Sequence, residues 1–151
     1  MVSGVILDFN RTLYDPDLKS LVNGAMQLLE RLRSSGYALC LISKKSTEER
    51  MEQIASLGID KYFKKILVIE GSKTEEHFRE CMDAMALPAK DIAVVGDRIR
   101  EEISLGNRMG MHTIWYKAGK FAVELPEGKG QEPYGTVTSL GEVWDCLQAM
   151  K

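Results

Sequence analysis

Residues 5–15 read Val-Ile-Leu-Asp-Phe-Asn-Arg-Thr-Leu-Tyr-Asp, and this stretch decides the fold. The continuous apolar run from Val5 to Leu7 is typical of a strand that is buried on both faces of a parallel sheet. Asp8 then stands at the carboxyl end of that strand, where open α/β sheets bind their ligands. An Asp in this position can also simply cap a turn. The stretch alone therefore leaves a functional and a structural interpretation open.

Strand-like and helix-like segments alternate along the rest of the chain. Short apolar runs predict further strands at residues 37–42, 66–69, 92–95, 111–116 and 136–138. Apolar residues three and four apart predict helices at residues 18–32, 46–57, 74–87, 99–110 and 139–147. Ser46 with Glu49, and Ser139 with Glu142, have the spacing of capping boxes. This alternation predicts an α/β protein with a parallel sheet, right-handed crossovers and helices on both faces.

The polar residues at the strand ends predict the order of the strands. If the expected strands are numbered along the chain, Asp8, Ser43 and Asp97 follow strands one, two and four. These residues share a site only if strand one lies between strands two and four. The order 5-4-1-2-3 achieves this and places the chain reversal beside strand one, where a ligand crevice is expected. We therefore expect a single-domain, three-layer Rossmann-like fold over residues 1–151.

The composition narrows the class of protein. A chain of 151 residues is typical of one domain with a normal core. The formal net charge of −2 provides no basic footprint, so we expect no nucleic-acid partner. No apolar run could span a bilayer and the N-terminus has no signal pattern, so we expect no membrane partner. Cys40, Cys81 and Cys146 are odd in number and far apart, which predicts buried thiols in a reducing, cytoplasmic compartment, without a zinc site.

Seven side chains at the predicted strand ends form the candidate site: Asp8, Asn10, Thr12, Ser43, Lys73, Asp97 and Glu102. Carboxylates from separate strands make an oxygen-rich pocket that suits Mg²⁺. A hydroxyl and an ammonium opposite them suit the oxygens of a phosphoryl group. Asp8 can act as a nucleophile, because carboxylates form aspartyl-phosphate intermediates.

At these residues the chain resembles the haloacid dehalogenase-like (HAD) superfamily, and the resemblance covers nearly all of it. Leu-Asp-Phe-Asn-Arg-Thr-Leu, around Asp8, is similar to the family's first motif, Asp-x-Asp-x-Thr. Ser43 at a strand end is similar to the second motif, and Lys73 before a helix is similar to the third. Val-Val-Gly-Asp-Arg-Ile-Arg-Glu-Glu-Ile, around Asp97, resembles the fourth. Each motif is weak alone, but four in the right order are specific.

The resemblance implies a Mg²⁺-dependent hydrolase of the phosphatase type. The metal ligands that it implies are Asp8, the backbone carbonyl of Asn10, Asp97 and, where a second acid usually stands, Glu102. It also implies that Ser43 and Lys73 bind phosphate, while Thr12 supports the loop.

Position 10 departs from the family pattern. The family's phosphatases carry an Asp there, which protonates the leaving group and later activates water. The amide of Asn10 can form hydrogen bonds but cannot exchange a proton. General acid–base catalysis contributes roughly 10²- to 10⁴-fold, so hydrolysis of ordinary phosphomonoesters should be weaker by about that factor. Three interpretations remain open: an enzyme for good leaving groups such as acyl phosphates, an enzyme whose acid comes from elsewhere, or a degenerate relative that only binds phosphate.

The spacing of the motifs leaves no room for a cap domain. About thirty residues separate Thr12 from Ser43, and as many separate Ser43 from Lys73, and one helix and one strand fill each interval. We expect an open site for a bulky or macromolecular phosphorylated substrate, or a site that a neighbouring subunit closes in a homo-oligomer. Residues 118–135 leave the fifth strand at the same edge, and we expect them to form a partial flap or an oligomer contact.

Three flanking residues have two interpretations each. Arg11 and Arg98 could bind a substrate anion, although exposed arginines are usually just solvated. Glu102 could orient Lys73 or a metal-bound water, or it could be a surface acid of a helix.

Two other functions compete with phosphate hydrolysis. A response-regulator receiver also binds Mg²⁺ through acidic residues, but its phosphoacceptor Asp ends strand three. Here the third expected strand ends in Glu70 and Gly71, which argues against a receiver. The stronger alternative is a non-catalytic module that uses the same pocket to bind a phosphorylated ligand or Mg²⁺.

Overall fold

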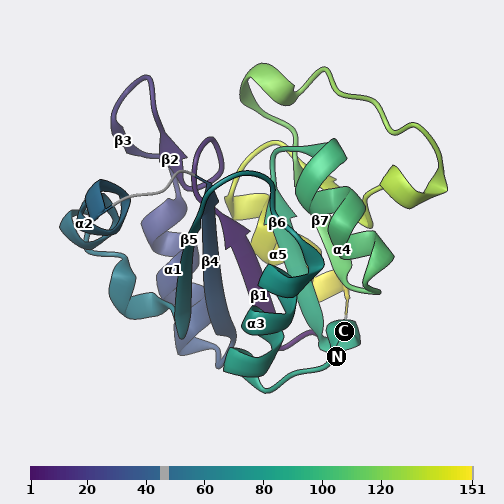
Figure 1. Cartoon of the computed structure of the whole chain (residues 1–151), viewed down its shortest axis with the longest axis horizontal. Coiled ribbons are helices and arrows are strands. Elements are labelled where there is room, and N and C mark those ends of the chain that lie inside the picture. The colour runs from purple at the N-terminus through teal and green to yellow at the C-terminus, as the bar shows by residue number, and fades with distance from the viewer. Residues whose placement is uncertain (45–47, 151) are drawn as a thin grey trace.

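The computed structural model describes residues 1–44 and 48–150, which form a three-layer α/β fold (Figure 1). Six parallel strands make the central sheet in the order β5-β4-β1-β6-β7-β8. These strands are β1 (Gly4–Asp8), β4 (Ala38–Lys44), β5 (Lys65–Ile69), β6 (Ile92–Gly96), β7 (His112–Tyr116) and β8 (Gly135–Val137). The order of the first five strands predicted along the chain is confirmed. The short β8 extends the sheet beyond it, at the edge beside β7.

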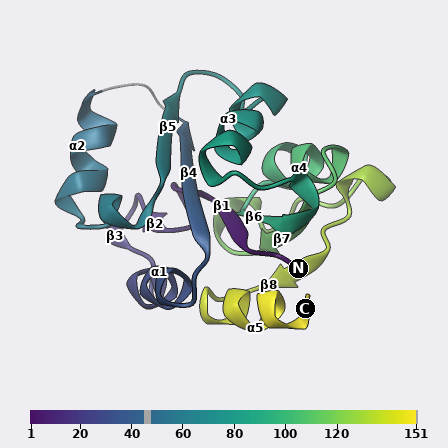
Figure 2. The same ribbon diagram turned by 90° about the horizontal axis from the view of Figure 1, so that it is seen from below.

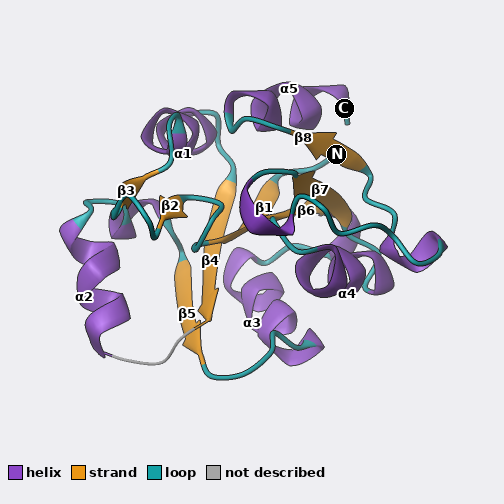
Figure 3. Cartoon of the chain, turned by 90° about the horizontal axis from the view of Figure 1, so that it is seen from above, coloured by secondary structure: helices purple, strands orange, loops and turns teal. Residues whose placement is uncertain are grey.

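Helices cover both faces of the sheet (Figures 2 and 3). Helices α1 (Ala25–Ser34) and α5 (Gly141–Ala149) lie on one face, and α3 (Glu75–Met85) and α4 (Ser104–Arg108) lie on the other. Helix α2 (Glu48–Ser56) adds Ile54 to the core on the α1 side. None of the described helices is long and apolar enough to cross a membrane.

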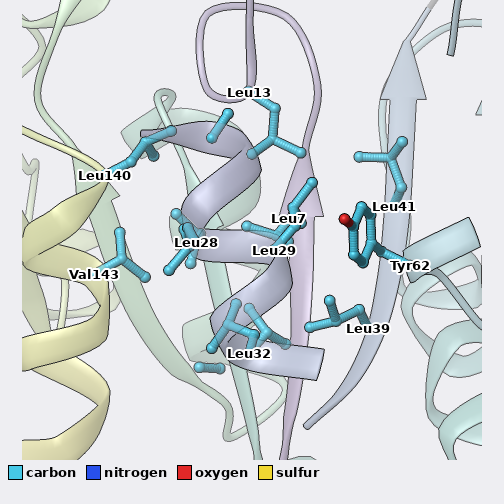
Figure 4. Close-up of a cluster of buried hydrophobic side chains, with 14 of the residues drawn as sticks. Leu7, Leu13, Leu28, Leu29, Leu32, Leu39, Leu41, Tyr62, Leu140 and Val143 are labelled. Carbon is cyan, nitrogen blue, oxygen red and sulfur yellow. The ribbon is translucent and has the colours of Figure 1, made fainter. Parts of the chain in front are cut away.

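Side chains of β1 point alternately into two apolar clusters, one on each face of the sheet. Val5 and Leu7 belong to the cluster under α1 and α5, while Ile6 belongs to the cluster under α3. Figure 4 shows the first cluster, in which α1 packs against the sheet and α5 through Leu28, Leu29, Leu32, Leu7, Leu39 and Val143. Each fully buried apolar side chain stabilises the fold by roughly 1.5–3 kcal/mol. This two-sided burial holds β1 in register and places Asp8 at its carboxyl end.

The helix predicted over residues 18–32 is wrong in its first half. Residues 14–21 instead form a small hairpin of β2 (Tyr14–Asp15) and β3 (Ser20–Leu21). The Asp15 carboxylate accepts hydrogen bonds from the backbone N–H groups of Asp17 and Leu18, at 2.9 and 3.2 Å, and so makes a turn that competes with helix. Leu18 is left 75% exposed, so its spacing from the leucines of α1 does not reflect a shared buried face.

The helix starts were predicted with mixed success. Ser46 lies outside the described residues, so its capping box with Glu49 stays a prediction. At α5, Glu142 accepts hydrogen bonds from the Thr138 backbone and from the hydroxyls of Thr138 and Ser139, at 2.9–3.2 Å. Ser139 therefore contacts Glu142 as predicted, but as a donor to it and without capping the helix backbone.

Cys40 and Cys81 are buried and Cys146 is partly exposed, and all three are free thiols. The prediction of buried, unpaired cysteines is confirmed for the first two. Cys146 is more accessible than predicted, because it packs against Gly135 of the edge strand β8.

Candidate active site

The residues predicted from strand ends gather at the carboxyl edge of the sheet. Asp8 ends β1, Asp97 directly follows β6, and Lys73 lies between β5 and α3. After β1 the chain turns sharply, because the backbone N–H groups of Thr12, Leu13 and Tyr14 all donate to the carbonyl of Phe9. Arg11 in this turn has a φ of 60°, which is unusual for a residue with a Cβ. The tight turn places Asn10 and Arg11 beside Asp8.

Lys73 is the centre of the site. Its Nζ donates to Asp8 Oδ1 at 2.7 Å and also to Glu102 Oε1. The Lys73 side chain is only 1% exposed. Burial alone would lower the pKa of Lys73, but the carboxylates of Asp8 and Glu102 raise it above its usual value. Lys73 is therefore a permanent cation next to the candidate nucleophile.

Asp97 carries a buried oxygen atom that has no hydrogen-bond partner in the described chain. Its Oδ2 accepts from Arg11 Nε at 3.0 Å, while Oδ1 is the unpartnered atom. Burial, and next the charge of Asp8, raise the pKa of Asp97 to about 7, against the opposing effect of Arg11. Trp115 Nε1 donates to the Asp97 carbonyl at 3.0 Å and holds this residue in place.

Glu102 reaches the site from a single turn of π-helix, Ile99–Ile103, that precedes α4. This wider turn folds the side chain over Gly96, where an added Cβ would lie 2.8 Å from Glu102 Oε2. The backbone N–H of Arg98 donates to the same oxygen at 3.2 Å. Burial raises the pKa of Glu102 to about 7, although Lys73 opposes the shift. Glu102 is thus a buried member of the site and not a surface acid.

The three carboxylates fit a divalent cation. Asp8, Asp97 and Glu102 each offer an oxygen atom, and these atoms lie within 4.8 Å of one another. All three residues are buried, and Asp97 Oδ1 needs a partner. Carboxylate oxygens in such a group are the ligands that Mg²⁺ prefers.

The site is a small cavity of about 50 Å³. The described residues that line it are Asp8, Asn10, Arg11, Lys44, Lys73, Asp97, Arg98, Glu101 and Glu102. Ser43 and Thr12 are not among them. Ser43 is buried at the end of β4 with its hydroxyl directed to the Lys44 carbonyl at 3.4 Å, and Thr12 Oγ1 lies 3.5 Å from Asp8 Oδ2. Five of the seven candidates therefore line one cavity, and Thr12 supports it from behind.

Three charged residues of the site were not predicted from the sequence: Lys44, Glu101 and Arg50. Lys44 pairs with Glu101 at 3.0 Å, and both line the cavity. Arg50 comes from α2, is 7% exposed, and its Nη1 donates to Asn10 Oδ1 at 3.1 Å. Lys44 directly follows Ser43, so its position after a strand could have suggested it. No sequence signal marks Arg50.

The loop after β7 contacts the site through Phe121. The guanidinium carbons of Arg11 and Arg98 lie 4.8 and 3.8 Å from the centre of its ring. Arg98 Nε also pairs with Glu124 of the same loop at 2.7 Å. Both arginines are therefore engaged with protein groups and are not simply solvated.

A larger hollow of about 550 Å³ adjoins the site. The hairpin β2–β3 and the segment after β7 line it, and Arg11 lines both this hollow and the small cavity. The hollow is wider than the small cavity, but the three buried carboxylates and Lys73 line only the latter. The reactive groups therefore line the small cavity, and the hollow is an additional space beside it.

Comparisons with known proteins agree with this geometry. The family model described as haloacid dehalogenase-like hydrolase matches residues 3–116. A glyceraldehyde 3-phosphate phosphatase from Pyrococcus abyssi is 34% identical over 103 residues, 66% of this chain and 43% of the relative. The enzyme of the same name from Pyrococcus furiosus is 29% identical over 131 residues, 84% of this chain and 54% of the relative. The chain thus spans about half the length of these curated relatives.

A solved structure confirms the fold over the whole length. The crystal structure of an uncharacterized protein from Listeria monocytogenes serotype 4b has a TM-score of 0.78 and 22% sequence identity. The match covers 99% of this chain and 98% of that one. At this level of identity the likeness concerns the fold alone.

Proposed function

Because the chain belongs to the haloacid dehalogenase-like hydrolase family, we propose that it is a Mg²⁺-dependent phosphatase whose nucleophile is Asp8. The observation that carries this proposal is the contact of Asp8 with Lys73 at 2.7 Å, inside a cavity that also holds Asp97 and Glu102. The curated relatives named as phosphatases support the same class of reaction.

The first chemical step is the attack of an Asp8 carboxylate oxygen on the phosphorus atom of the substrate. The new O–P bond gives an aspartyl-phosphate, and the bond from phosphorus to the leaving oxygen breaks. Lys73 balances part of the negative charge that gathers around the phosphoryl oxygens. Lys73 stays protonated, because Asp8 and Glu102 raise its pKa. Lys44, at the rim of the cavity, is a second cation for the same oxygens.

We assign the Mg²⁺ site to the carboxylates of Asp8 and Asp97, with the backbone carbonyl of Asn10 and with Glu102 nearby. The unpartnered Asp97 Oδ1 supports this assignment. Bound Mg²⁺ would reduce the repulsion between the Asp8 carboxylate and the phosphate dianion. Arg11 holds the other Asp97 oxygen and so orients this carboxylate.

The second step is the attack of water on the aspartyl-phosphate, which releases phosphate and restores Asp8. Asn10 cannot accept a proton from that water, so the proton passes to solvent. The same amide cannot protonate a leaving group in the first step. We therefore expect acyl and aryl phosphates to react faster than alkyl phosphates such as glyceraldehyde 3-phosphate, the compound named for the relatives.

The site also has room for the rest of a substrate molecule. The hollow of about 550 Å³ beside Arg11 gives the non-phosphate part of a substrate a place to bind. Three predictions from the sequence stay predictions: a phosphorylated substrate, self-association into a homo-oligomer and a cytoplasmic location.

The test is hydrolysis of acetyl phosphate and of p-nitrophenyl phosphate by the purified chain, with Mg²⁺ or with EDTA. We expect turnover that needs Mg²⁺ and is lost in Asp8→Asn, which keeps the shape of the side chain but removes its nucleophilic oxygen. The matched control Asp145→Asn changes an exposed acid on α5 and should keep the wild-type rate. Equal rates for the wild type and Asp8→Asn would contradict the proposal.

Asn10 favours one competing function, a module that binds phosphate and Mg²⁺ without turnover. Calorimetry separates the two, because such a module would bind inorganic phosphate with Mg²⁺ and yet hydrolyse neither compound.

A further inference from the structure

Arg50 is a buried arginine that the reaction described so far does not use. It lies in α2, and its guanidinium carbon is 4.7 Å from the centre of the Phe9 ring. Phe9 stacks in turn on Tyr14, with ring centres 5.0 Å apart and planes 10° from parallel. Arg50 is thus packed on the ring of Phe9, which Tyr14 supports. Its Nη1 donates to the side chain of Asn10 at 3.1 Å.

This contact decides how the amide of Asn10 is oriented. A guanidinium carries only hydrogen-bond donors, so the amide atom that it contacts must be the oxygen, Oδ1. The amide group is planar, with oxygen and NH₂ on opposite sides. With Oδ1 held by Arg50, the NH₂ group is the part of the Asn10 side chain that remains for the cavity, which Asn10 lines together with Asp8.

We propose that Arg50 is a positioning residue that directs the Asn10 NH₂ group at the departing oxygen of the substrate, so that the site selects acyl phosphates. The proposal rests on the proposed function, because it concerns the leaving group of the same reaction. In this proposal Asn10 acts as a hydrogen-bond donor at the position where the family's phosphatases carry an Asp.

The step balances without a proton from the protein. Asp8 forms the new bond to phosphorus, and the electron pair of the breaking P–O bond stays on the departing oxygen. A carboxylate, the leaving group of an acyl phosphate, is stable as this anion. The Asn10 N–H groups donate a hydrogen bond to the anion but transfer nothing. An alkoxide would need a proton, and the site offers none from position 10.

The reverse orientation of the amide would work against the reaction. If the Asn10 oxygen faced the cavity, its partial negative charge would repel the departing anion. Hydrogen bonds to charged groups contribute more than neutral ones, so the orientation of a single donor matters. Without Arg50, both orientations become accessible.

The test is a double-mutant cycle of the wild type, Arg50→Met, Asn10→Ala and the double variant. The probes are acetyl phosphate and a series of aryl phosphates whose leaving groups differ in basicity. We expect Arg50→Met to lower kcat/KM for acetyl phosphate about tenfold, in line with the loss of one hydrogen bond to a charged group. The loss should grow with the basicity of the aryl leaving group, and Arg50→Lys, which keeps a donor, should restore most of the rate.

In the Asn10→Ala background the same Arg50→Met change should have no further effect, because the group that Arg50 positions is gone. Arg33→Met is the matched control. Arg33 also lies over an aromatic ring, that of Tyr62, and donates to a carbonyl at 3.0 Å, but away from the site. Melting temperatures identify any variant that fails to fold, and Arg50→Lys serves as the second variant.

Additive losses in the cycle, or a loss that is equal for all leaving groups, would overturn the role of Arg50. A wild type that hydrolyses none of the probes would instead overturn the proposed function. The two failures are therefore distinguishable.

Discussion

Under the proposed function, Asn10 holds the position at which an acid would allow the site to hydrolyse ordinary phosphate esters. We expect Asn10→Asp to raise the hydrolysis of alkyl phosphates, because a carboxyl group can donate and accept a proton. General acid–base catalysis supplies roughly 10²- to 10⁴-fold. The gain should lie at the lower end, since Arg50, 3.1 Å from this side chain, stabilises the ionised form. Steady-state kinetics with glycerol phosphate measures it, and a variant no faster than the wild type would count against our interpretation of Asn10.

Gly96 leaves the space that the Glu102 carboxylate occupies. A Cβ at position 96 would lie 2.8–2.9 Å from that carboxylate, so Gly96→Ala should push Glu102 away from Lys73. We expect a lower melting temperature, equivalent to about 1–3 kcal/mol of overpacking, and reduced turnover. Gly141→Ala is the control, because a Cβ added at position 141 would have no neighbour within 4 Å. A Gly96→Ala variant that melts and reacts like the wild type would show that Glu102 can move without consequence.

The sequence predicts which residues directly after strands belong to the site, but it does not predict Arg50, which lies in a helix. Asp8 and Asp97 follow apolar runs whose parallel pairing brings their ends together, so the sequence alone indicates that they meet. Arg50 lies forty positions after Asn10 and reaches it only because α2 packs beside the loop after β1. Ser43 lies at a strand end as predicted, but a strand-end position does not fix the direction of a hydroxyl, which here is toward the Lys44 carbonyl.

At the scale of elements, the hairpin β2–β3 shows where helical spacing misleads. Leu18 and Leu21 continue the spacing of the α1 leucines, yet the Asp15 carboxylate forms a turn that interrupts the pattern. Gly24, with a φ of 86°, separates this segment from α1. The local side-chain hydrogen bonds of Asp15 and the backbone of Gly24 outweigh periodicity here. The spacing of apolar residues reflects neither effect.

The start of α5 makes stability depend on pH through Glu142. Hydrogen bonds from Thr138 lower the pKa of Glu142 below its ordinary value of 4.5. A lowered pKa means that the ionised form stabilises the fold above about pH 4.5, and that this stabilisation disappears as the pH falls through the lower, folded-state pKa. We expect Glu142→Gln to melt below the wild type at neutral pH and to approach it in acid. Thermal melts over this range test it, and a difference that does not change with pH would contradict it.

Phe121 packs the loop after β7 against two arginines of the site, Arg11 and Arg98. Phe121→Ala removes the ring between Arg11 and Arg98, so we expect faster proteolysis within residues 119–131 and a several-fold change in kcat/KM. Val123→Ala is the control, because Val123 is 83% exposed. Deletion of the loop without a change in either turnover or assembly would contradict both the flap and the oligomer contact that the sequence suggested.

At the scale of the whole molecule, the parallel sheet explains why so few residues define the site. Five strands in the predicted order bring Asp8, Lys73 and Asp97 to one edge, although they are far apart in sequence. The position of β8 and the π-helical turn that carries Glu102 depend on tertiary packing, so periodicity could not predict them. The matched segments make up only about half of the curated relatives, and the residues of the site all lie within the part that the family model covers, 3–116.

The central claim is that Asp8 accepts the phosphoryl group. The most direct measurement is mass spectrometry of the chain after rapid acid quenching of its reaction with acetyl phosphate and Mg²⁺. We expect the mass of one phosphoryl group on the peptide that contains Asp8, and its absence in Asp8→Asn. A wild type that turns over acetyl phosphate without this adduct, or an adduct that persists in Asp8→Asn, would contradict the claim.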